Sequence, residues 1–369
     1  MVHLWLRAET KPMEHRAALT PATAKQLIKA GFQITVEESD QRIFDDHEYA
    51  EVGCTMVPFG SWKEKAPSDA YIIGLKELPE NDTSPLNHTH IFFAHCFKNQ
   101  AGWKEILHRF KGSGGKILDL EFLQDVQGRR VAAFGFMAGF AGAAVSLDVW
   151  CHQKKGLKMG ALKPFQNEQA LIDYAKGNLR ETLGRHDNYP TLMVMGARGR
   201  CGSGAVDFAK KVGLPAENII QWDMEETKKG GPFPEIMKAD IFVNCIYLNQ
   251  KIPPFMTQEM IDSDGRQLTV ICDVSCDTTN PNNPIPVYSV NTTFDQPTVQ
   301  VKTSSKRPLD VISIDHLPTL LPRESSNMFS QDLLPTLMEL KDIESSSVWQ
   351  RAQRLFYEKL HLATLTNKL

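Results

Sequence analysis

The segment that most restricts the possible folds is a short apolar run that leads through closely spaced glycines into a helix pattern. Leu192–Met195 is entirely apolar, Gly196, Gly199 and Gly202 follow, and apolar residues then recur at helical spacing over 205–212. Glycine permits a tight turn and a close approach of the backbone to a ligand. The N-terminus of the following helix attracts a phosphate group. The segment therefore predicts a strand–turn–helix unit of an α/β domain, with a dinucleotide pyrophosphate at the turn.

An acidic residue after the next predicted strand supports this interpretation. The strand expected over 218–222 is followed directly by Asp223, about 20 residues beyond the turn. A carboxylate at this place accepts hydrogen bonds from the hydroxyl groups of an adenine ribose. A carboxylate there also repels a 2′-phosphate and favours NAD over NADP, an inference that the nearby Lys228 and Lys229 weaken. The glycine spacing departs from Gly-x-Gly-x-x-Gly, so a structural turn with a surface aspartate stays open. The candidate cofactor-binding residues are Gly196, Gly199, Arg200, Cys201, Gly202, Ser203 and Asp223.

Polar residues directly follow several strands predicted in the N-terminal third. The strands are expected over 71–75, 91–94 and 116–120, and they run into Lys76-Glu77, His95 and Glu121. Open α/β sheets bind their ligands at the carboxyl ends of their strands. These side chains are therefore candidates for a substrate site.

The chemistry of this set suits acid–base catalysis beside an anionic ligand. A partly buried Lys76 or His95 can titrate near neutral pH and transfer protons. Arginine makes bidentate contacts to carboxylates, which makes Arg16 and Arg130 candidate anion contacts. A solvent-exposed Lys76, a hydrogen-bonded core His95 and a structural Arg130 remain alternatives that the spacing does not decide.

Composition narrows the class of protein. The 369 residues suffice for two domains, and a formal net charge of −3 gives no basic field for nucleic acid or anionic membrane. Seven cysteines without a C-x-x-C pair argue against a disulfide framework or a structural zinc site. An intracellular, mostly reduced globular protein is expected.

An uncharged stretch over 131–147 has some features of a membrane-spanning helix. It contains Gly135-x-x-x-Gly139 but is shorter than the roughly 20 apolar residues that span a bilayer. We expect a buried interdomain helix that stops at Asp148, followed by a surface loop over 152–163. No membrane contact is expected.

The order of the predicted elements gives the domain organisation. Further strands are expected at Leu192–Met195, 218–222, Ile241–Asn244, 269–272 and 311–314, and the tail from Ser325 onward is expected to be helical. We predict an α/β protein with two Rossmann-like domains, whose parallel-rich twisted sheets are flanked by helices, and an active-site cleft between them. Residues 1–135 plus 325–369 would form a substrate-binding domain, and 136–324 an NAD-binding domain.

Several segments together resemble one family. They are Leu6-Arg7-Ala8-Glu9-Thr10-Lys11-Pro12, Ile73-Gly74-Leu75-Lys76-Glu77, Phe93-Ala94-His95-Cys96, Asp119-Leu120-Glu121-Phe122-Leu123, 128–135, 199–204, Asp273-Val274-Ser275 and Ile314-Asp315-His316-Leu317-Pro318. The chain is similar over its whole length to the fungal saccharopine dehydrogenases, which are NAD-dependent and lysine-forming and belong to the alanine dehydrogenase and transhydrogenase superfamily. The resemblance implies a monomer that converts saccharopine, NAD⁺ and water into lysine, 2-oxoglutarate and NADH.

The resemblance also implies roles for individual residues. Lys76 and His95 match the acid–base pair, and Arg16 and Arg130 match residues that hold substrate carboxylates. Lys98, Glu77 and Glu121 would line the same pocket, and Asp315 lies in a loop that the family places near the cofactor. Cys201 and Cys245 match cysteines that lie close together near the nucleotide, and we expect free thiols in a reducing compartment.

Location and rival functions stay open at this point. The terminal Asn367-Lys368-Leu369 approximates a peroxisomal signal but departs at its first position, so we expect a cytoplasmic or peroxisomal protein. One rival is an alanine dehydrogenase-like amino-acid oxidoreductase. Another is a non-catalytic NAD-binding sensor, against which the presence of both Lys76 and His95 argues.

Overall fold

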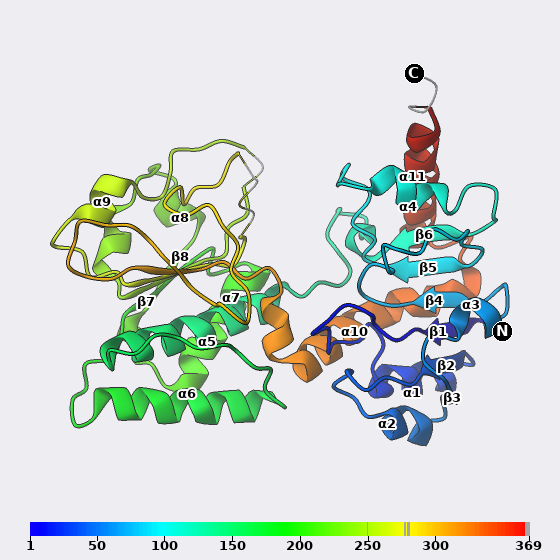
Figure 1. Ribbon diagram of the computed structural model, residues 1–369, viewed down its shortest axis with the longest axis horizontal. Coiled ribbons are helices and arrows are strands. Elements are labelled where there is room, and N and C mark those ends of the chain that lie inside the picture. Colours follow the sequence, from blue (N-terminus) through cyan, green and yellow to red (C-terminus); the bar gives the residue numbers. More distant parts are fainter. Residues whose placement is uncertain (249, 277, 279–280, 366–369) are drawn as a thin grey trace. The chain divides into compact units, whose positions relative to one another are not determined.

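The chain forms two compact units, each built around one six-stranded sheet (Figure 1). The computed structural model describes residues 1–248, 250–276, 278 and 281–365. The first unit joins Met1–Ala133 to Pro322–Leu369, and the second is Phe134–Leu321. The α/β class predicted from the sequence is confirmed.

The sheet of the first unit is entirely parallel, with strand order β3-β2-β1-β4-β5-β6. Its strands are β1 (His3–Leu6), β2 (Gln33–Glu37), β3 (Thr55–Val57), β4 (Tyr71–Ile73), β5 (Thr89–Phe92) and β6 (Lys116–Asp119). The strands expected near 71–75, 91–94 and 116–120 are confirmed with shifted ends. Parallel pairing brings the carboxyl ends of β1, β4, β5 and β6 to one edge, in that order.

Helices cover the first sheet and return the end of the chain to its beginning. They are α1 (Pro21–Lys29), α2 (Asp46–Glu51), α3 (Trp62–Lys65), α4 (Trp103–His108), α10 (Pro322–Met338) and α11 (Ser347–Leu365). Thr20 caps α1, with its hydroxyl accepting from the Thr23 N–H. Ser330 of α10 donates to or accepts from the Thr23 hydroxyl at 2.6 Å. The predicted helical tail is therefore confirmed.

The sheet of the second unit has strand order β11-β12-β10-β9-β7-β8 and is parallel except at β11. Its strands are β7 (Leu192–Met195), β8 (Ile219–Trp222), β9 (Ile241–Asn244), β10 (Val270–Asp273), β11 (Val299–Gln300) and β12 (Asp310–Ile312). The helices are α5 (Gly135–Lys154), α6 (Glu168–Leu183), α7 (Arg200–Val212), α8 (Met224–Thr227) and α9 (Gln258–Asp262).

The apolar stretch at 131–147 forms the start of α5, and the expected end of this helix was wrong. The helix continues through Asp148 to Lys154, so the surface loop expected from residue 152 also starts too early. Asp148 is tolerated inside because Tyr174 and Asn178 of α6 donate to its carboxylate at 3.1 and 2.6 Å. Burial raises the pKa of Asp148, and His152 opposes this rise.

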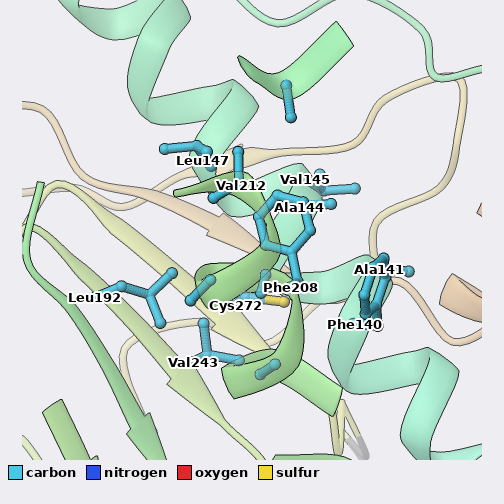
Figure 2. Packing of buried hydrophobic residues seen from close by; sticks show 14 of the residues in the cluster. Phe140, Ala141, Ala144, Val145, Leu147, Leu192, Phe208, Val212, Val243 and Cys272 are labelled. Carbon is cyan, nitrogen blue, oxygen red and sulfur yellow. The ribbon is translucent and has the colours of Figure 1, made fainter. Parts of the chain in front are cut away.

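The glycines of α5 pack this helix against α7 within the second unit. A Cβ on Gly139 would lie 1.8 Å from the carbonyl oxygen of Cys201, and one on Gly204 would lie 1.9 Å from that of Phe136. The backbones of α5 and α7 therefore touch directly. Phe140 and Phe208 lie in the same core (Figure 2). Their ring centroids are 5.4 Å apart. Among the described residues, no helix is long and apolar enough to cross a membrane.

Candidate active site

The carboxyl edge of the first sheet gathers the polar residues that were predicted at strand ends. Glu9 follows β1, Lys76 and Glu77 follow β4, His95 follows β5, and Glu121 follows β6. These four strands are neighbours in the sheet, so segments far apart in sequence are brought side by side. This edge is the place where open α/β sheets bind ligands.

His95 is held in one orientation by Glu77. Its Nδ1 hydrogen-bonds to Glu77 Oε1, and its ring stacks on Phe93 with centroids 6.2 Å apart. The other oxygen of Glu77 lies 2.9 Å from the Lys11 ammonium. Burial alone would raise the pKa of Glu77, but His95 and Lys11 together hold it well below its usual range. Glu77 is therefore a fixed anion that orients the imidazole.

The backbone of His95 adopts a left-handed conformation, with φ of +50°. Residues with a Cβ seldom adopt this region, and such strain clusters at functional sites. The side chain is 38% exposed, so it remains accessible from the edge of the sheet. His95 therefore combines an unusual backbone conformation with a side chain that is both oriented and accessible.

Lys76 sits on a main chain that is fixed by buried charges. Glu9 accepts from the Leu75 and Lys76 N–H groups at 2.6 and 3.0 Å, and Arg7 donates to the Lys76 carbonyl. Arg7 passes so close to Gly74 that a Cβ there would lie 2.5 Å from its guanidinium carbon. The Lys76 side chain is half-buried, and its position along the edge is set by this network.

Arg16 forms a buried pair with its near neighbour Glu14. Its Nε and Nη2 donate to the two carboxylate oxygens at 2.9 and 2.8 Å. Burial would raise the pKa of Glu14, but the charge of Arg16, with a smaller contribution from Lys76, lowers it. Lys76 therefore lies within electrostatic reach of this pair.

Glu121 joins two further cations from the predicted set. Its Oε1 accepts from Lys98 Nζ at 2.5 Å and from Arg130 Nη2 at 2.6 Å. Burial would raise the pKa of Glu121, but Lys98 and Arg130 lower it. Two cations thus converge on one carboxylate at this edge of the sheet. Cations of this kind suit an incoming carboxylate.

The second unit contains the predicted strand–turn–helix. Gly196 has a φ of +82°, and its N–H and that of Ala197 donate to the Trp222 carbonyl at 2.8 and 3.0 Å. A Cβ on Gly202 would lie 2.0 Å from the Gly196 oxygen, so only glycine fits there. Helix α7 begins at Arg200 without a side-chain cap or an acidic residue in its first turn. These features suit a pyrophosphate at the helix N-terminus.

Asp223 lies at the end of β8 and connects this strand to the glycine turn. Its Oδ2 accepts from the Arg198 N–H and its Oδ1 from the Met224 N–H, each at 2.9 Å. The capping box of α8 adds the Glu226 N–H as a third donor to this carboxylate, so about one of its roughly four acceptor positions remains for a ribose hydroxyl. The placement agrees with what a ribose-binding acid requires.

The segment Asp273-Val274-Ser275 of the second unit is connected by hydrogen bonds to the residues that support the glycine turn. Asp273 accepts from Asn244 at 3.0 Å and from the Tyr288 hydroxyl at 2.5 Å, while Ser275 donates to the Ile246 carbonyl at 2.9 Å. A Cβ on Gly196 would lie 3.0 Å from the Ile246 side chain, so the glycine turn packs against Ile246, whose carbonyl accepts from Ser275. The Asp273-Val274-Ser275 segment thus ties the ends of β9 and β10 together.

Known proteins are similar to this chain over nearly its whole length. Residues 5–141 match the family model described as alanine dehydrogenase/PNT, N-terminal domain. The Schizosaccharomyces pombe protein named saccharopine dehydrogenase (NAD⁺, L-lysine-forming) is 61% identical over 96% of this chain and 97% of its own length. The Emericella nidulans protein of the same name is 58% identical over 97% of each chain. The chain belongs to the saccharopine dehydrogenase family.

Solved structures agree with the fold of this saccharopine dehydrogenase family member. An L-alanine dehydrogenase matches with a TM-score of 0.66 at 13% identity, covering 97% of this chain and 100% of the other. A transhydrogenase from Sinorhizobium meliloti matches with a TM-score of 0.59 at 15% identity, covering 92% and 94%. At such low identity the likeness concerns the fold alone.

The structure of this family member brings most of the candidate residues into two groups. The first unit groups Lys76, Glu77, His95, Lys98, Glu121 and Arg130 at the sheet edge, with Arg16 near Lys76. The second unit groups Gly196, Gly199, Arg200, Cys201, Gly202, Ser203 and Asp223 around the turn. Asp315 follows β12 and is exposed, and it makes no hydrogen bond or ion pair with either group among the described residues. Cys201 adjoins Cys245, and both are free thiols.

Sequence reasoning missed the buried residues that hold the groups in place. Arg7, Glu9 and Asp119 received no role, although all three lie within or beside the motifs that carry the family resemblance. Burial raises the pKa of Asp119 to about 6, while the Glu121 and Ala94 N–H groups that it accepts from oppose the rise. The one signal in the sequence that could have identified these buried residues was a charged side chain at or just after the end of an apolar strand.

Proposed function

We propose that this chain catalyses the NAD-dependent oxidative cleavage of saccharopine to L-lysine and 2-oxoglutarate, the final step of the α-aminoadipate route to lysine. Relatives at 61% and 58% identity carry the name saccharopine dehydrogenase (NAD⁺, L-lysine-forming). The observation that carries the proposal is the placement of Lys76 and an oriented His95 on the neighbouring strand ends of β4 and β5. The overall change is saccharopine, NAD⁺ and water to lysine, 2-oxoglutarate, NADH and a proton.

The two units are proposed to divide the work of binding. Residues 1–135 plus 325–369 would bind substrate, and 136–324 would bind NAD. The glycine turn and the uncapped start of α7 fit the pyrophosphate, and Asp223 fits the adenine ribose. Bound NAD⁺ would supply the hydride acceptor for the substrate carbon that becomes the 2-oxo carbon of 2-oxoglutarate.

Lys76 and His95 are proposed to share the proton transfers. One removes the proton of the secondary amine as the hydride leaves, and the other moves protons as the resulting imine takes up water and releases lysine. Glu77 holds Nδ1 of His95, which leaves Nε2 as the nitrogen that reaches substrate. The fixed main chain of Lys76 limits where its ammonium can reach. Both groups are thus positioned before substrate binds.

The cations near this pair are proposed to hold the carboxylates of the 2-oxoglutarate portion. Arg16, Lys98 and Arg130 are each already in contact with a carboxylate of the chain, namely Glu14 or Glu121. A substrate carboxylate would add to these pairs, since Lys98 and Arg130 converge on the single carboxylate of Glu121. Glu77 and Glu121 would keep the surrounding charge in balance.

Assembly and location form a separate part of the proposal. We propose a monomer in the cytoplasm or the peroxisome, as the family resemblance implies. Asn367-Lys368-Leu369, on which the peroxisomal alternative depends, lies outside the described residues.

A direct assay tests the proposed function. Purified protein with saccharopine and NAD⁺ should form NADH, with lysine and 2-oxoglutarate in equal amounts. In the reverse direction, NADH should be consumed with lysine plus 2-oxoglutarate but not with pyruvate plus ammonia. Turnover with pyruvate and ammonia alone would identify an alanine dehydrogenase instead, and NAD binding without any turnover would identify a sensor.

A further inference from the structure

A cavity of about 650 Å³ opens beside His95 and Glu77 within the first unit. Its walls come from the segment that follows β4, over residues 77–86, and from α4 with its flanking residues. Pockets of about 300–1,000 Å³ are typical of small-molecule sites. The cavity is therefore large enough for a substrate arm, and it begins at the proposed acid–base group.

The lining of the cavity changes character from floor to rim. Phe92, Phe110, Leu86 and Ile106 give an apolar floor that is continuous with the core of the unit. Polar side chains then surround the rim, and they are Glu80, Asp82, Gln100, Glu105, His108 and Arg109. A lining of this kind suits an aliphatic chain that ends in charged groups.

The charges of the rim are only partly satisfied within the protein. Asp82 pairs with Lys63 and with Arg109, whose Nη2 lies 3.1 Å from the Asp82 carboxylate. Glu80 and Glu105 are exposed, and neither makes an ion pair in the part of the chain that the structure describes. Glu80 and Glu105 therefore offer acceptors for an ammonium group. The basic groups of the lining are His108 and Arg109, of which Arg109 is 11% exposed and already paired with Asp82.

We propose that this cavity binds the lysine-derived arm of the substrate, an inference that rests on the proposed function. Saccharopine joins an aliphatic arm with an amino-acid end to a dicarboxylate through one secondary amine. With that amine at His95, the four methylenes lie along Phe92, Phe110 and Ile106. The α-ammonium group then reaches Glu105 or Glu80, and the α-carboxylate reaches Arg109 or His108.

The distribution of charge around His95 supports this direction of binding. After β5 and β6, Lys98 and Arg130 both contact Glu121, and these two cations suit the dicarboxylate portion. The cavity on the α4 side has more acids than bases and an apolar floor. Two chemically different ends of one substrate thus meet two different environments on either side of one histidine.

Two substitutions test the cavity through kinetics in the direction that consumes lysine. Glu105→Gln removes a rim charge without changing size, and Thr83→Trp fills space at an exposed lining position. We expect the KM for lysine to rise about fivefold for Glu105→Gln, the scale of one exposed ion pair. We expect a rise of roughly tenfold or more for Thr83→Trp. The KM values for 2-oxoglutarate and NADH should stay within about twofold.

Matched controls separate a local effect from a general one. Glu51→Gln lies on α2, which contacts β3 at the opposite edge of the sheet, and Asn87→Trp adds the same ring at an exposed position outside the cavity lining. Both should leave the KM for lysine unchanged. An unchanged KM for lysine in Glu105→Gln and Thr83→Trp, with wild-type turnover present, overturns the cavity assignment alone. A wild-type protein that does not turn over lysine overturns both proposals.

Discussion

A single methyl group added at Gly139 tests the direct contact between α5 and α7. In Gly139→Ala the new Cβ would lie 1.8 Å from the Cys201 carbonyl oxygen and 2.7 Å from its carbon. That is roughly 1.6 Å short of ordinary contact, and both atoms belong to a helix backbone that cannot rotate away. The two helices must separate, which disturbs the packing that Figure 2 shows around Phe140 and Phe208.

The magnitude follows from two opposing contributions. Alanine favours a helix over glycine by about 1 kcal/mol, whereas overpacking a close-packed core costs about 1–3 kcal/mol and more where backbone must move. We expect a net loss of about 2–4 kcal/mol in the free energy of unfolding. NAD binding should weaken as well, because Cys201 lies in the first turn of α7 and that turn moves.

The same chemical change at Gly177 provides the control. Gly177 lies within α6, and a Cβ there meets nothing within 4 Å. Gly177→Ala should therefore stabilise the protein by about 0.5–1 kcal/mol, so the two variants differ in sign. Urea denaturation followed by circular dichroism, with NADH fluorescence for binding, measures both. A Gly139→Ala protein as stable as Gly177→Ala would refute the reasoning.

The remaining predictions concern the two sites. Lys76→Met with His95→Gln should lower kcat at least a hundredfold or so while NADH titration shows unchanged affinity, and surviving turnover would exclude this pair. Asp223→Ala should weaken NAD binding and narrow the NAD/NADP preference measured as a ratio of kcat/KM, and an unchanged ratio would exclude a ribose contact. Burial raises the pKa of Asp119 to about 6 from 3.8, so its contribution to stability is present below pH 3.8 and lost as pH rises through about 6. Asp119→Asn should flatten that slope in denaturation curves, and an identical slope in both proteins would contradict the assignment.

Local sequence determined much of the site because strand ends are read from short segments. Apolar runs ending in Lys76, His95 and Glu121 predicted both the strands and the polar edge, and parallel pairing then placed these ends next to each other. The glycine turn was equally visible, since Gly196 needs a positive φ and Gly202 a close backbone contact. Each of these signals depends on fewer than about ten neighbouring residues.

Tertiary contacts decided what the local pattern could not express. Asp148 looked like the end of a helix, because its partners Tyr174 and Asn178 belong to another helix and compensate its charge only after folding. The Gly135-x-x-x-Gly139 pattern indicated a close helix contact but did not say which element makes it. The structure shows that this element is α7.

The sequence by itself thus determined the α/β class, the strand–turn–helix unit and the identity of the charged residues at the strand ends. Only the tertiary structure decided how those charges pair, with Glu77 orienting His95, Glu9 fixing the Lys76 backbone and Glu121 joining Lys98 to Arg130. The reason is physical. Backbone conformation follows from neighbours along the chain, whereas the energy of a charge depends on burial and on partners that the fold brings from distant segments.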